Sequence, residues 1–319
     1  MKKKYVRWTL WTIASPFILF IILCILIYLP PIQNFLVDKA AVYASEATGM
    51  NISVGRISLS FPLNLVVTDV DAASPHNDTL LSVRRLQVNV QLLPLLKKQV
   101  EVDGISLQGA TVNSNDLIHG MKLNGTLGEL FISSHGVALD PETAIVNKVL
   151  LKDTDLSLCL NDTAAVDTAA SDTTYWKIIL QDIDLQNVSF ALDMPLDSLS
   201  LAASLDNAIL RDGLIDLHKS AYSLQTFRIK NGRVRYDSGK PLAADSLPSG
   251  LDPSHIALTD IGVKLDSLYY EGRNMKAIIS QFVLKERSGV EIVSATGRMV
   301  SNDKVLRVPS LKLETRDSY

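Results

Sequence analysis

The sequence predicts a mainly β protein: a single N-terminal transmembrane helix, a short amphipathic helix, and an elongated antiparallel β-sheet curled into an open apolar groove. Three observations predict this fold class. An uncharged apolar run at 8–29 follows a basic tip, apolar side chains then recur at helical spacing, and from residue 51 onward apolar and polar residues alternate. The corresponding regions are 1–29 (cytoplasmic tip and anchor), 30–50 (juxtamembrane helix) and 51–319 (repetitive groove).

The apolar run is long enough to cross a bilayer. Its 22 residues make a helix of about 33 Å, against a hydrocarbon core of about 30 Å. The positive charges of the tip precede the run, which predicts a cytoplasmic N-terminus and a single pass. A cleaved signal peptide is the alternative, but its apolar core would be shorter and would precede small residues rather than two prolines. The anchor residues that we single out are Trp8, Trp11, Pro16, Phe20, Cys24, Tyr28 and Leu29.

A short amphipathic helix is predicted after the two prolines. Its apolar residues fall on one face, and Gly49 is placed to end the helix. We expect this helix to sit just outside the membrane, as a plug over the region that follows. The residues of the apolar face are Ile32, Phe35, Leu36, Ala40, Tyr43 and Ala47.

The rest of the chain has the period of two that is typical of strands with one apolar and one wetted face. The pattern is clear at 57–63, 86–92, 156–160 and 199–205. Loops are predicted near 161–174, which is almost entirely Asp, Thr, Ala and Ser, and near 238–254, which is rich in Pro, Gly, Ser and Asp. At roughly 20 strands spaced by 4.8 Å, the sheet would extend on the order of 100 Å.

A step of three repeatedly interrupts this alternation, from Val102 to Ile105, from Leu180 to Ile183 and from Leu258 to Ile261 across Asp260. A longer step, from Ile229 to Val234, contains Asn231 and Gly232. Both apolar residues of such a step share a face only if a bulge or tight turn absorbs the extra residue, and Asp, Asn and Gly suit those conformations. The repetition predicts a sheet that grows by repeats. The side chains that we expect to line the groove are Ile57, Leu59, Phe61, Val88, Val90, Val102, Ile105, Leu107, Leu180, Ile183, Leu185, Ile229, Val234, Leu258, Ile261 and Val263.

Charge and cysteine content exclude several classes of function. The net charge is -3 with no basic block beyond the tip, so no nucleic-acid partner is expected. Cys159 is the only cysteine outside the apolar run, which leaves no disulfide framework and fits a bacterial periplasmic protein.

Catalytic chemistry is not expected either. The five histidines lack metal-like spacing, and no nucleophile or phosphate-loop motif occurs, so we expect no metal, no cofactor and no enzyme activity. The pairs Asp153 with Asp155 and Asp182 with Asp184 are interpreted as turn and wet-face residues rather than as catalytic carboxylates.

The predicted loop at 161–174 carries three Asp-Thr-small triplets, at 162–164, 167–169 and 172–174. They resemble the pattern of general O-glycosylation in Bacteroidota. Plain low complexity explains the same residues equally well, so both interpretations stay open.

Residues 49–112 resemble the N-terminal module of the AsmA-like superfamily, particularly its TamB branch. The resemblance rests on the helix ending at Gly49 and on the segments 52–62, 66–70, 78–81, 86–96 and 102–112, in this order and spacing. The resemblance implies an inner-membrane-anchored protein of a Gram-negative envelope, with a long twisted sheet forming an apolar groove. It further implies phospholipid transport toward the outer membrane, or outer-membrane protein assembly with an Omp85-type barrel.

Two alternatives stay open beside this expectation. The first is a membrane-anchored β-rich scaffold or binding module with a closed core and no lipid cargo, and the second is an envelope enzyme. The last residues, 314–319, show no capping segment, so we also expect a fragment of a longer chain or a short member of the family that needs a partner.

Overall fold

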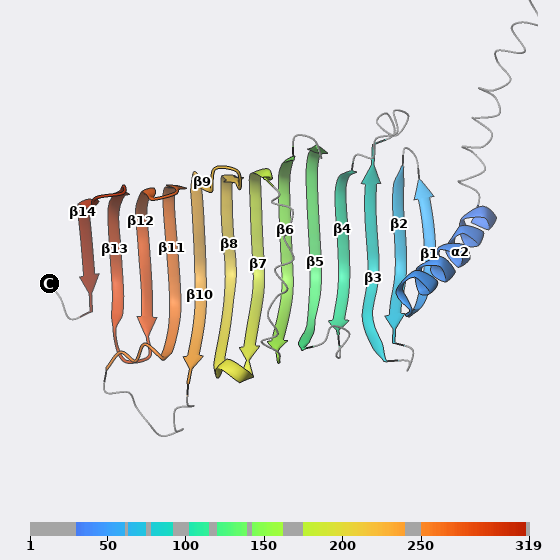
Figure 1. The fold of residues 1–319 in the computed structure, drawn as a ribbon, viewed down its shortest axis with the longest axis horizontal. Helices are drawn as coiled ribbons and strands as arrows, with labels where there is room; N and C mark the ends of the chain where they lie inside the picture. Colours follow the sequence, from blue (N-terminus) through green and yellow to red (C-terminus); the bar gives the residue numbers. More distant parts are fainter. Residues whose placement is uncertain are drawn as a thin grey trace, which may run out of the picture.

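The computed structural model describes residues 30–60, 63–74, 78–91, 102–114, 120–138, 142–161, 175–239 and 250–316. Within these ranges it contains one α-helix, α2 (Pro30–Thr48), one 3-10 turn, η1 (Pro195–Asp197), and a sheet of 14 strands (Figure 1). The prediction of a mainly β chain is therefore confirmed. In the described residues, no helix has both the length and the apolar character needed to cross a membrane. The predicted residues outside these ranges are Trp8, Trp11, Pro16, Phe20, Cys24, Tyr28, Leu29 and Phe61.

The strands are long, and those in the middle of the sheet are the longest. The bounds are β1 (Asn51–Ser60), β2 (Asn64–Ala73), β3 (Thr79–Val90), β4 (Val102–Asn113), β5 (Met121–Ala138), β6 (Thr143–Leu160), β7 (Lys177–Met194), β8 (Leu199–Asp216), β9 (Ala221–Leu224), β10 (Thr226–Ser238), β11 (His255–Glu271), β12 (Asn274–Glu286), β13 (Glu291–Ser301) and β14 (Leu306–Thr315).

All strands form one curved sheet, in which neighbours in the chain are mostly neighbours in space (Figure 1). The order runs from β1 to β14, with the short β9 off the path and paired with β8 and β11. Thirteen strands in sequence span about 58 Å at 4.8 Å per step. The expectation of roughly 20 strands and 100 Å was wrong, because β5 to β8 have 18 residues each and use up the chain in fewer strands.

The expectation of a purely antiparallel sheet was also wrong at one position. β6 and β7 are parallel, with Thr143 beside Lys177 and Cys159 beside Asp193. A parallel pair needs a connection that returns the whole length of the strand, which takes a dozen residues or more. Residues 161–176 provide that length, so the predicted loop connects opposite ends of two neighbouring strands.

The helix α2 packs against β1 and crosses that strand obliquely at this end of the sheet (Figure 1). Ser45 Oγ accepts a hydrogen bond from the backbone N–H of Ile52 at 3.0 Å, and Gln33 Nε2 donates to the carbonyl of Leu59 at 3.1 Å. Gly49 follows the helix with a φ of 70°, the left-handed conformation that commonly ends a helix. The helix therefore covers the edge of the sheet, where open backbone groups would otherwise invite pairing with another chain.

The described residues of the predicted apolar face of α2 point away from β1. Phe35 and Tyr43 are 60% and 75% exposed, and Ala47 is exposed as well. The side chains of Ile32, Leu36 and Ala40 lie outside the described part. The side that meets β1 carries Gln33 and Ser45 instead, because the edge of a strand offers hydrogen-bonding groups rather than an apolar surface.

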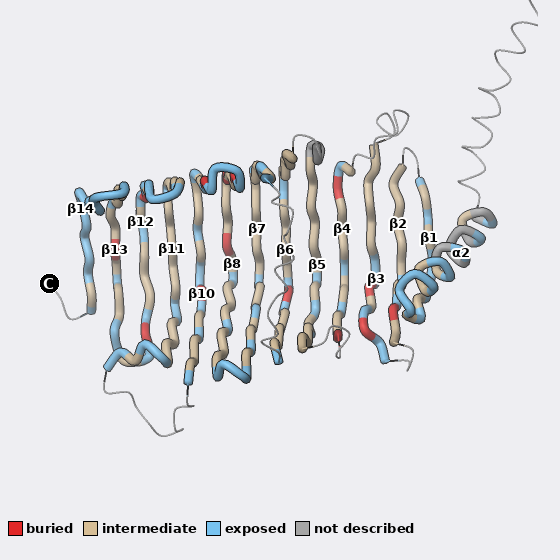
Figure 2. Tube along the Cα trace, in the orientation of Figure 1, coloured by how far each residue is buried: buried red, intermediate tan, exposed pale blue. Residues whose placement is uncertain are grey.

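The sheet is a single layer, and its side chains are correspondingly half-exposed (Figure 2). No described side chain is fully buried, and the most deeply buried apolar residues are mainly alanines. In the described ranges no second layer covers either face of the sheet.

Candidate functional site

The strongest candidate site is one face of the sheet, where apolar side chains are paired from strand to strand without interruption. Directly paired residues share a face, so a chain of pairings traces a row across the sheet. Row A crosses all thirteen strands of the path. It consists of Leu59, Leu65, Val88, Ile105, Ile132, Val149, Ile183, Leu210, Phe227, Leu265, Ile279, Gly297 and Leu311.

Row B runs beside row A and also crosses all thirteen strands. Every member is apolar, and we call the side of the sheet that carries both rows the apolar face. Row B consists of Ile57, Val67, Leu86, Leu107, Leu130, Leu151, Leu185, Ala208, Ile229, Val263, Phe282, Ala295 and Leu313.

The structure places every described residue of the predicted groove lining on this one face. Four belong to row A and five to row B, and the other six lie in adjacent rows of the same face. Those six are Val90, Val102, Leu180, Val234, Leu258 and Ile261. The sequence therefore identified one shared face, although it did not show which strands are neighbours.

Two complete rows could not be read from the sequence, because they depend on register. Leu65, Leu130 and Phe227 were not among the predicted lining. Leu65 pairs with the predicted Val88 and Leu130 with the predicted Leu107, whereas both partners of Phe227, Leu210 and Leu265, were missed as well. The alternation within β2 and within β5 could have identified Leu65 and Leu130, because every second residue of a strand lies on the same face of the sheet.

A line of left-handed residues, which we call the crease, crosses the sheet beside row B. Each member lies within a strand, where a positive φ is unusual for any residue other than glycine. Their φ values lie between 50° and 61°. The members are Asp69, Gly109, Asp153, Asn187, Asn231 and Asp260.

The crease explains the steps of three in the sequence. A left-handed residue adds one residue to the strand but does not take part in the alternation of side chains between the two faces. The next apolar side chain of the same face therefore comes three residues later instead of two. On β6 the apolar face accordingly passes from Leu151 to the buried Thr154, across Asp153. The strands next to β6 skip one residue at the same height of the sheet. The pairing of the strands is therefore the same on both sides of the crease.

Glycine or a polar partner faces the crease residues on neighbouring strands. A Cβ at Gly55 would lie 2.9 Å from the Cβ of Asp69, and one at Gly128 would lie 2.8 Å from that of Asp153, so only glycine fits there. Asn187 Nδ2 donates to Asp153 Oδ1 at 2.9 Å. The crease is thus a line of polar residues and glycines that runs across the sheet beside the apolar rows.

At its C-terminal end the crease carries charge. Lys285 Nζ lies 3.2 Å from a carboxylate oxygen of Asp260 and 3.6 Å from one of Glu291. The hydrogen bond to Asp260 and the charge of Glu291 raise the pKa of Lys285 above its ordinary value.

The predicted steps of three were right about the shared face and only partly right about the residue that absorbs the step. Asn231 and Asp260 are left-handed as expected. Between Leu180 and Ile183 the left-handed residue is Asp212, on the neighbouring strand β8. Between Val102 and Ile105 a register shift against β3 takes its place. The extra residue can be absorbed on either strand of a pair, which a single-strand pattern does not reveal.

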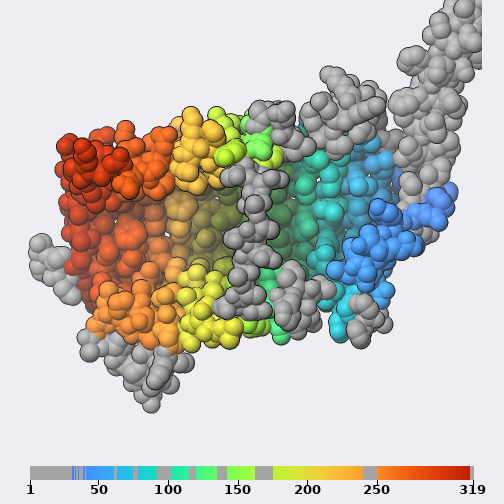
Figure 3. All heavy atoms as spheres, in the orientation of Figure 1, coloured from blue at the N-terminus to red at the C-terminus, as the bar shows by residue number. Residues whose placement is uncertain are grey.

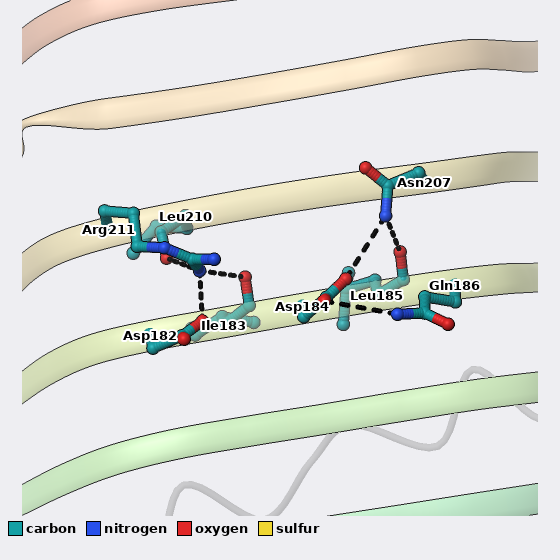
Figure 4. Close-up of polar contacts among 8 residues, drawn as sticks. All are labelled: Asp182, Ile183, Asp184, Leu185, Gln186, Asn207, Leu210 and Arg211. Atoms are coloured by element: carbon teal, nitrogen blue, oxygen red, sulfur yellow. Dashed lines mark hydrogen bonds and ion pairs between the residues drawn. The ribbon is translucent and has the colours of Figure 1, made fainter.

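The opposite face is polar over β7 and β8, and two of its carboxylates, Asp182 and Asp184, are already engaged (Figure 4). Arg211 forms an ion pair with Asp182 and donates to the carbonyl of Ile183 at 3.3 Å. Asp184 accepts hydrogen bonds from Asn207 and Gln186, each at 3.2 Å. These contacts hold β7 to β8 and leave Asp182 and Asp184 as structural residues of the wetted face.

A pocket of about 430 Å³ lies over the middle of the sheet, on β6, β7, β8, β10 and β11. Five residues of one row of the apolar face are among its lining, and most of its surface is apolar. These five are Leu156, Phe190, Ala203, Val234 and Leu258. The molecular surface drawn in Figure 3 is recessed along its middle, between the raised ends of the strands. Ala203 contributes little more than backbone, which leaves room between its larger neighbours.

Among the described residues, no three His, Cys, Asp or Glu side chains lie close enough together to hold a metal ion. His255 Nδ1 lies 2.9 Å from Asp252 Oδ2, and His218 packs edge-on against Tyr175 with ring centroids 5.1 Å apart. Hydrogen bonds from the backbone of Ser254 and from His255 lower the pKa of Asp252. These contacts fold local turns and do not converge on a common point.

Comparison with known proteins adds no relative: no family model matches the chain, and no curated protein sequence matches it. We therefore infer the function from the apolar face and the pocket over it.

Proposed function

We propose that this chain is a membrane-anchored β-groove protein of the AsmA/TamB-like kind. In this proposal, its apolar face lines the groove and holds phospholipid acyl chains, and the protein serves phospholipid transport or outer-membrane biogenesis in a Gram-negative envelope. The single observation that carries the proposal is the pair of unbroken apolar rows across thirteen strands, with no second layer over them in the described residues.

The physical argument starts from the size of the apolar face. A contiguous apolar surface that spans about 58 Å is far larger than soluble monomers usually expose, and such surfaces mark sites that bind apolar partners. Acyl chains suit it, since each methylene that leaves water contributes about 0.8 kcal/mol. Burial of this kind has no preferred direction, so a lipid could move along the rows without a catalytic group.

The address of the protein in this proposal comes from the sequence. The apolar run at 8–29 would anchor the chain in the bacterial inner membrane as a single pass, and the sheet would stand in the periplasm. An Omp85-type barrel in the outer membrane is the proposed partner at the far end. No metal or cofactor has a role in this function.

The experiment compares two neighbouring leucines of β6 that point to opposite faces. Leu151 pairs with Leu130 and Leu185 on the apolar face, whereas Leu150 pairs with Phe131 and Asp184 on the other. A photoreactive benzoylphenylalanine is introduced at each position of the full chain in cells grown with radioactive phosphate. We expect a radioactive lipid adduct at position 151 and only background labelling at position 150.

A functional readout accompanies the crosslinks. Leu151→Asp should weaken the outer-membrane barrier at unchanged protein level, and Leu150→Asp should leave it intact. Equal crosslinking at both positions, or none at 151, would show that the apolar face does not hold phospholipid.

A further inference from the structure

The helix α2 carries its aromatic residues on the side that faces away from the sheet. Tyr43 is 75% exposed, Phe35 60% and Val42 54%. The side against β1 carries Gln33 and Ser45, which hydrogen-bond to the backbone of that strand. A helix that covers a globular core has the reverse arrangement, with its apolar stripe inward. Something other than the described sheet must therefore cover the outward side.

One exposed face of α2, which we call the stripe, carries Phe35, Lys39, Val42 and Tyr43, spaced by four, seven and eight residues. The exposed Glu46 follows at the C-terminal end of the same face. Lys39 Nζ lies 5.9 Å from the centre of the Phe35 ring. Aromatic rings together with a lysine whose stem lies along apolar surface are typical of residues at the membrane–water interface.

The position of α2 in the chain identifies the occupant. The apolar run at 8–29 ends one residue before Pro30, where α2 begins. Tyr43 lies about 20 Å further along the helix axis than Pro30, since each residue rises 1.5 Å. An upright helix would lift Tyr43 out of reach of the bilayer, whereas a helix lying flat keeps the whole stripe at the headgroup level.

We propose that α2 lies in the plane of the membrane interface, with Phe35, Val42 and Tyr43 inserted at the boundary between headgroups and acyl chains. The occupant of the stripe is the bilayer surface itself. The inference rests on the membrane anchoring of the proposed function. Because α2 is hydrogen-bonded to β1, the arrangement holds the β1 edge of the sheet at the membrane and directs β14 away from it.

The test uses the full chain with both native cysteines replaced by serine and one new cysteine carrying an environment-sensitive NBD dye. The dye is placed at Tyr43→Cys on the stripe, or at Leu196→Cys as the control, since Leu196 is 64% exposed in the turn η1, away from α2. Each protein is reconstituted in phosphatidylcholine–phosphatidylglycerol vesicles, with or without nitroxide-labelled lipid. We expect nitroxide lipid to quench the dye at position 43 by about two-fold or more, and iodide in the buffer to quench the dye at position 196.

Flotation of the same vesicles separates the two proposals. If the chain floats with the vesicles but nitroxide lipid leaves the dye at 43 unquenched, the anchor stands and this inference is overturned. A chain that does not float overturns both. Shielding of position 43 that depends on protein density, without quenching by lipid, would assign the stripe to a second copy and also overturn the inference.

Discussion

The two edges of the sheet are built differently. At the β1 edge, α2 packs against the strand and satisfies two of its backbone groups, the N–H of Ile52 through Ser45 and the C=O of Leu59 through Gln33. At the β14 edge no described element covers the strand, and nine of its ten residues are exposed. Pro309 and Lys312 on β14 are residues that discourage pairing with a further strand. One edge is thus closed by a helix, and the other is protected by composition alone.

The chemistry that holds the two ends also differs. The β1 edge uses neutral hydrogen bonds, which do not change with pH. At the β12–β14 end a charged group takes part: Glu286 accepts a hydrogen bond from the Ser288 backbone N–H at 2.6 Å. Lys312 lies 2.7 Å from Glu314 on the exposed strand β14, where an ion pair adds little stability. Burial alone would raise the pKa of Glu286, but hydrogen bonds from Ser288, Ala257 and Arg287 outweigh that effect and lower it.

The crease distinguishes the same two parts. Its left-handed residues occur from β2 to β11, and none of the described non-glycine residues of β12 to β14 has a positive φ. Pairings among the last strands contain repeated register shifts. From β2 to β11 the crease lies at one shared level and is accompanied by local register shifts, whereas the described residues of β12 to β14 show the local register shifts without the crease.

The largest expected difference in the free energy of unfolding comes from placing a carboxylate on β3 or on β14. Val83 on β3 is 6% exposed, whereas Leu311 on β14 is 65% exposed. Val83→Asp should lower the free energy of unfolding by more than about 3 kcal/mol, because it buries an unpaired carboxylate. Leu311→Asp should change it by less than about 0.5 kcal/mol. Urea unfolding of the full chain in mild detergent, followed by circular dichroism, measures both. Equal losses would mean that β14 is covered in solution.

The next effect is expected at the crease. Asn187→Val places a β-branched residue at a φ of 50° and removes the hydrogen bond to Asp153, which should cost about 2 kcal/mol. Asn187→Gly keeps the conformation and should cost about half as much or less. Thr296→Val on β13, which has no left-handed residue nearby, is the control and should be almost neutral. The same unfolding measurement checks all three variants. If the two Asn187 variants lose the same free energy of unfolding, the left-handed backbone conformation does not contribute to the loss.

A smaller effect tests the covered edge. Ser45→Ala removes the hydrogen bond to the Ile52 N–H and should cost about 1 kcal/mol, with faster amide exchange along β1. Lys312→Ala breaks an exposed ion pair at the other edge and should have no measurable effect. Hydrogen exchange read out by mass spectrometry distinguishes the two. Unchanged exchange in β1 would show that α2 does not protect that edge.

The smallest effect concerns pH. The pKa of Glu286 is lowered from its ordinary value of 4.5 in the folded protein, so its contribution to stability is present above the unfolded pKa and is lost as pH falls through the folded one. Glu286→Gln should therefore be less stable than the native protein at pH 7, and this deficit should shrink as the pH falls below 4.5, the ordinary pKa of the group. Thermal unfolding across this pH range measures the difference. Ser45→Ala is the control, since its deficit should stay constant with pH.

Much of the candidate site could be predicted because it depends on local geometry. Alternation along a strand assigns side chains to faces, so Ile183, Leu185 and Val263 were placed on one face without knowledge of their neighbours. The steps of three were visible for the same reason. The parallel pairing of β6 with β7 was not visible, because Leu156 and Phe190 show the same alternation whichever way the neighbouring strand runs.

The sequence by itself determined the period of each strand, the residues of the apolar face within it, and the end of the helix at Gly49. These follow from backbone geometry over a few residues. Only the tertiary structure decided the order of the strands, the two unbroken rows, the single layer and the outward turn of Phe35 and Tyr43. Those features depend on which distant backbone groups pair with each other. Gln33 and Ser45 of α2 face β1 because the unpaired N–H and C=O groups at the edge of that strand need hydrogen-bond partners, which apolar side chains cannot provide.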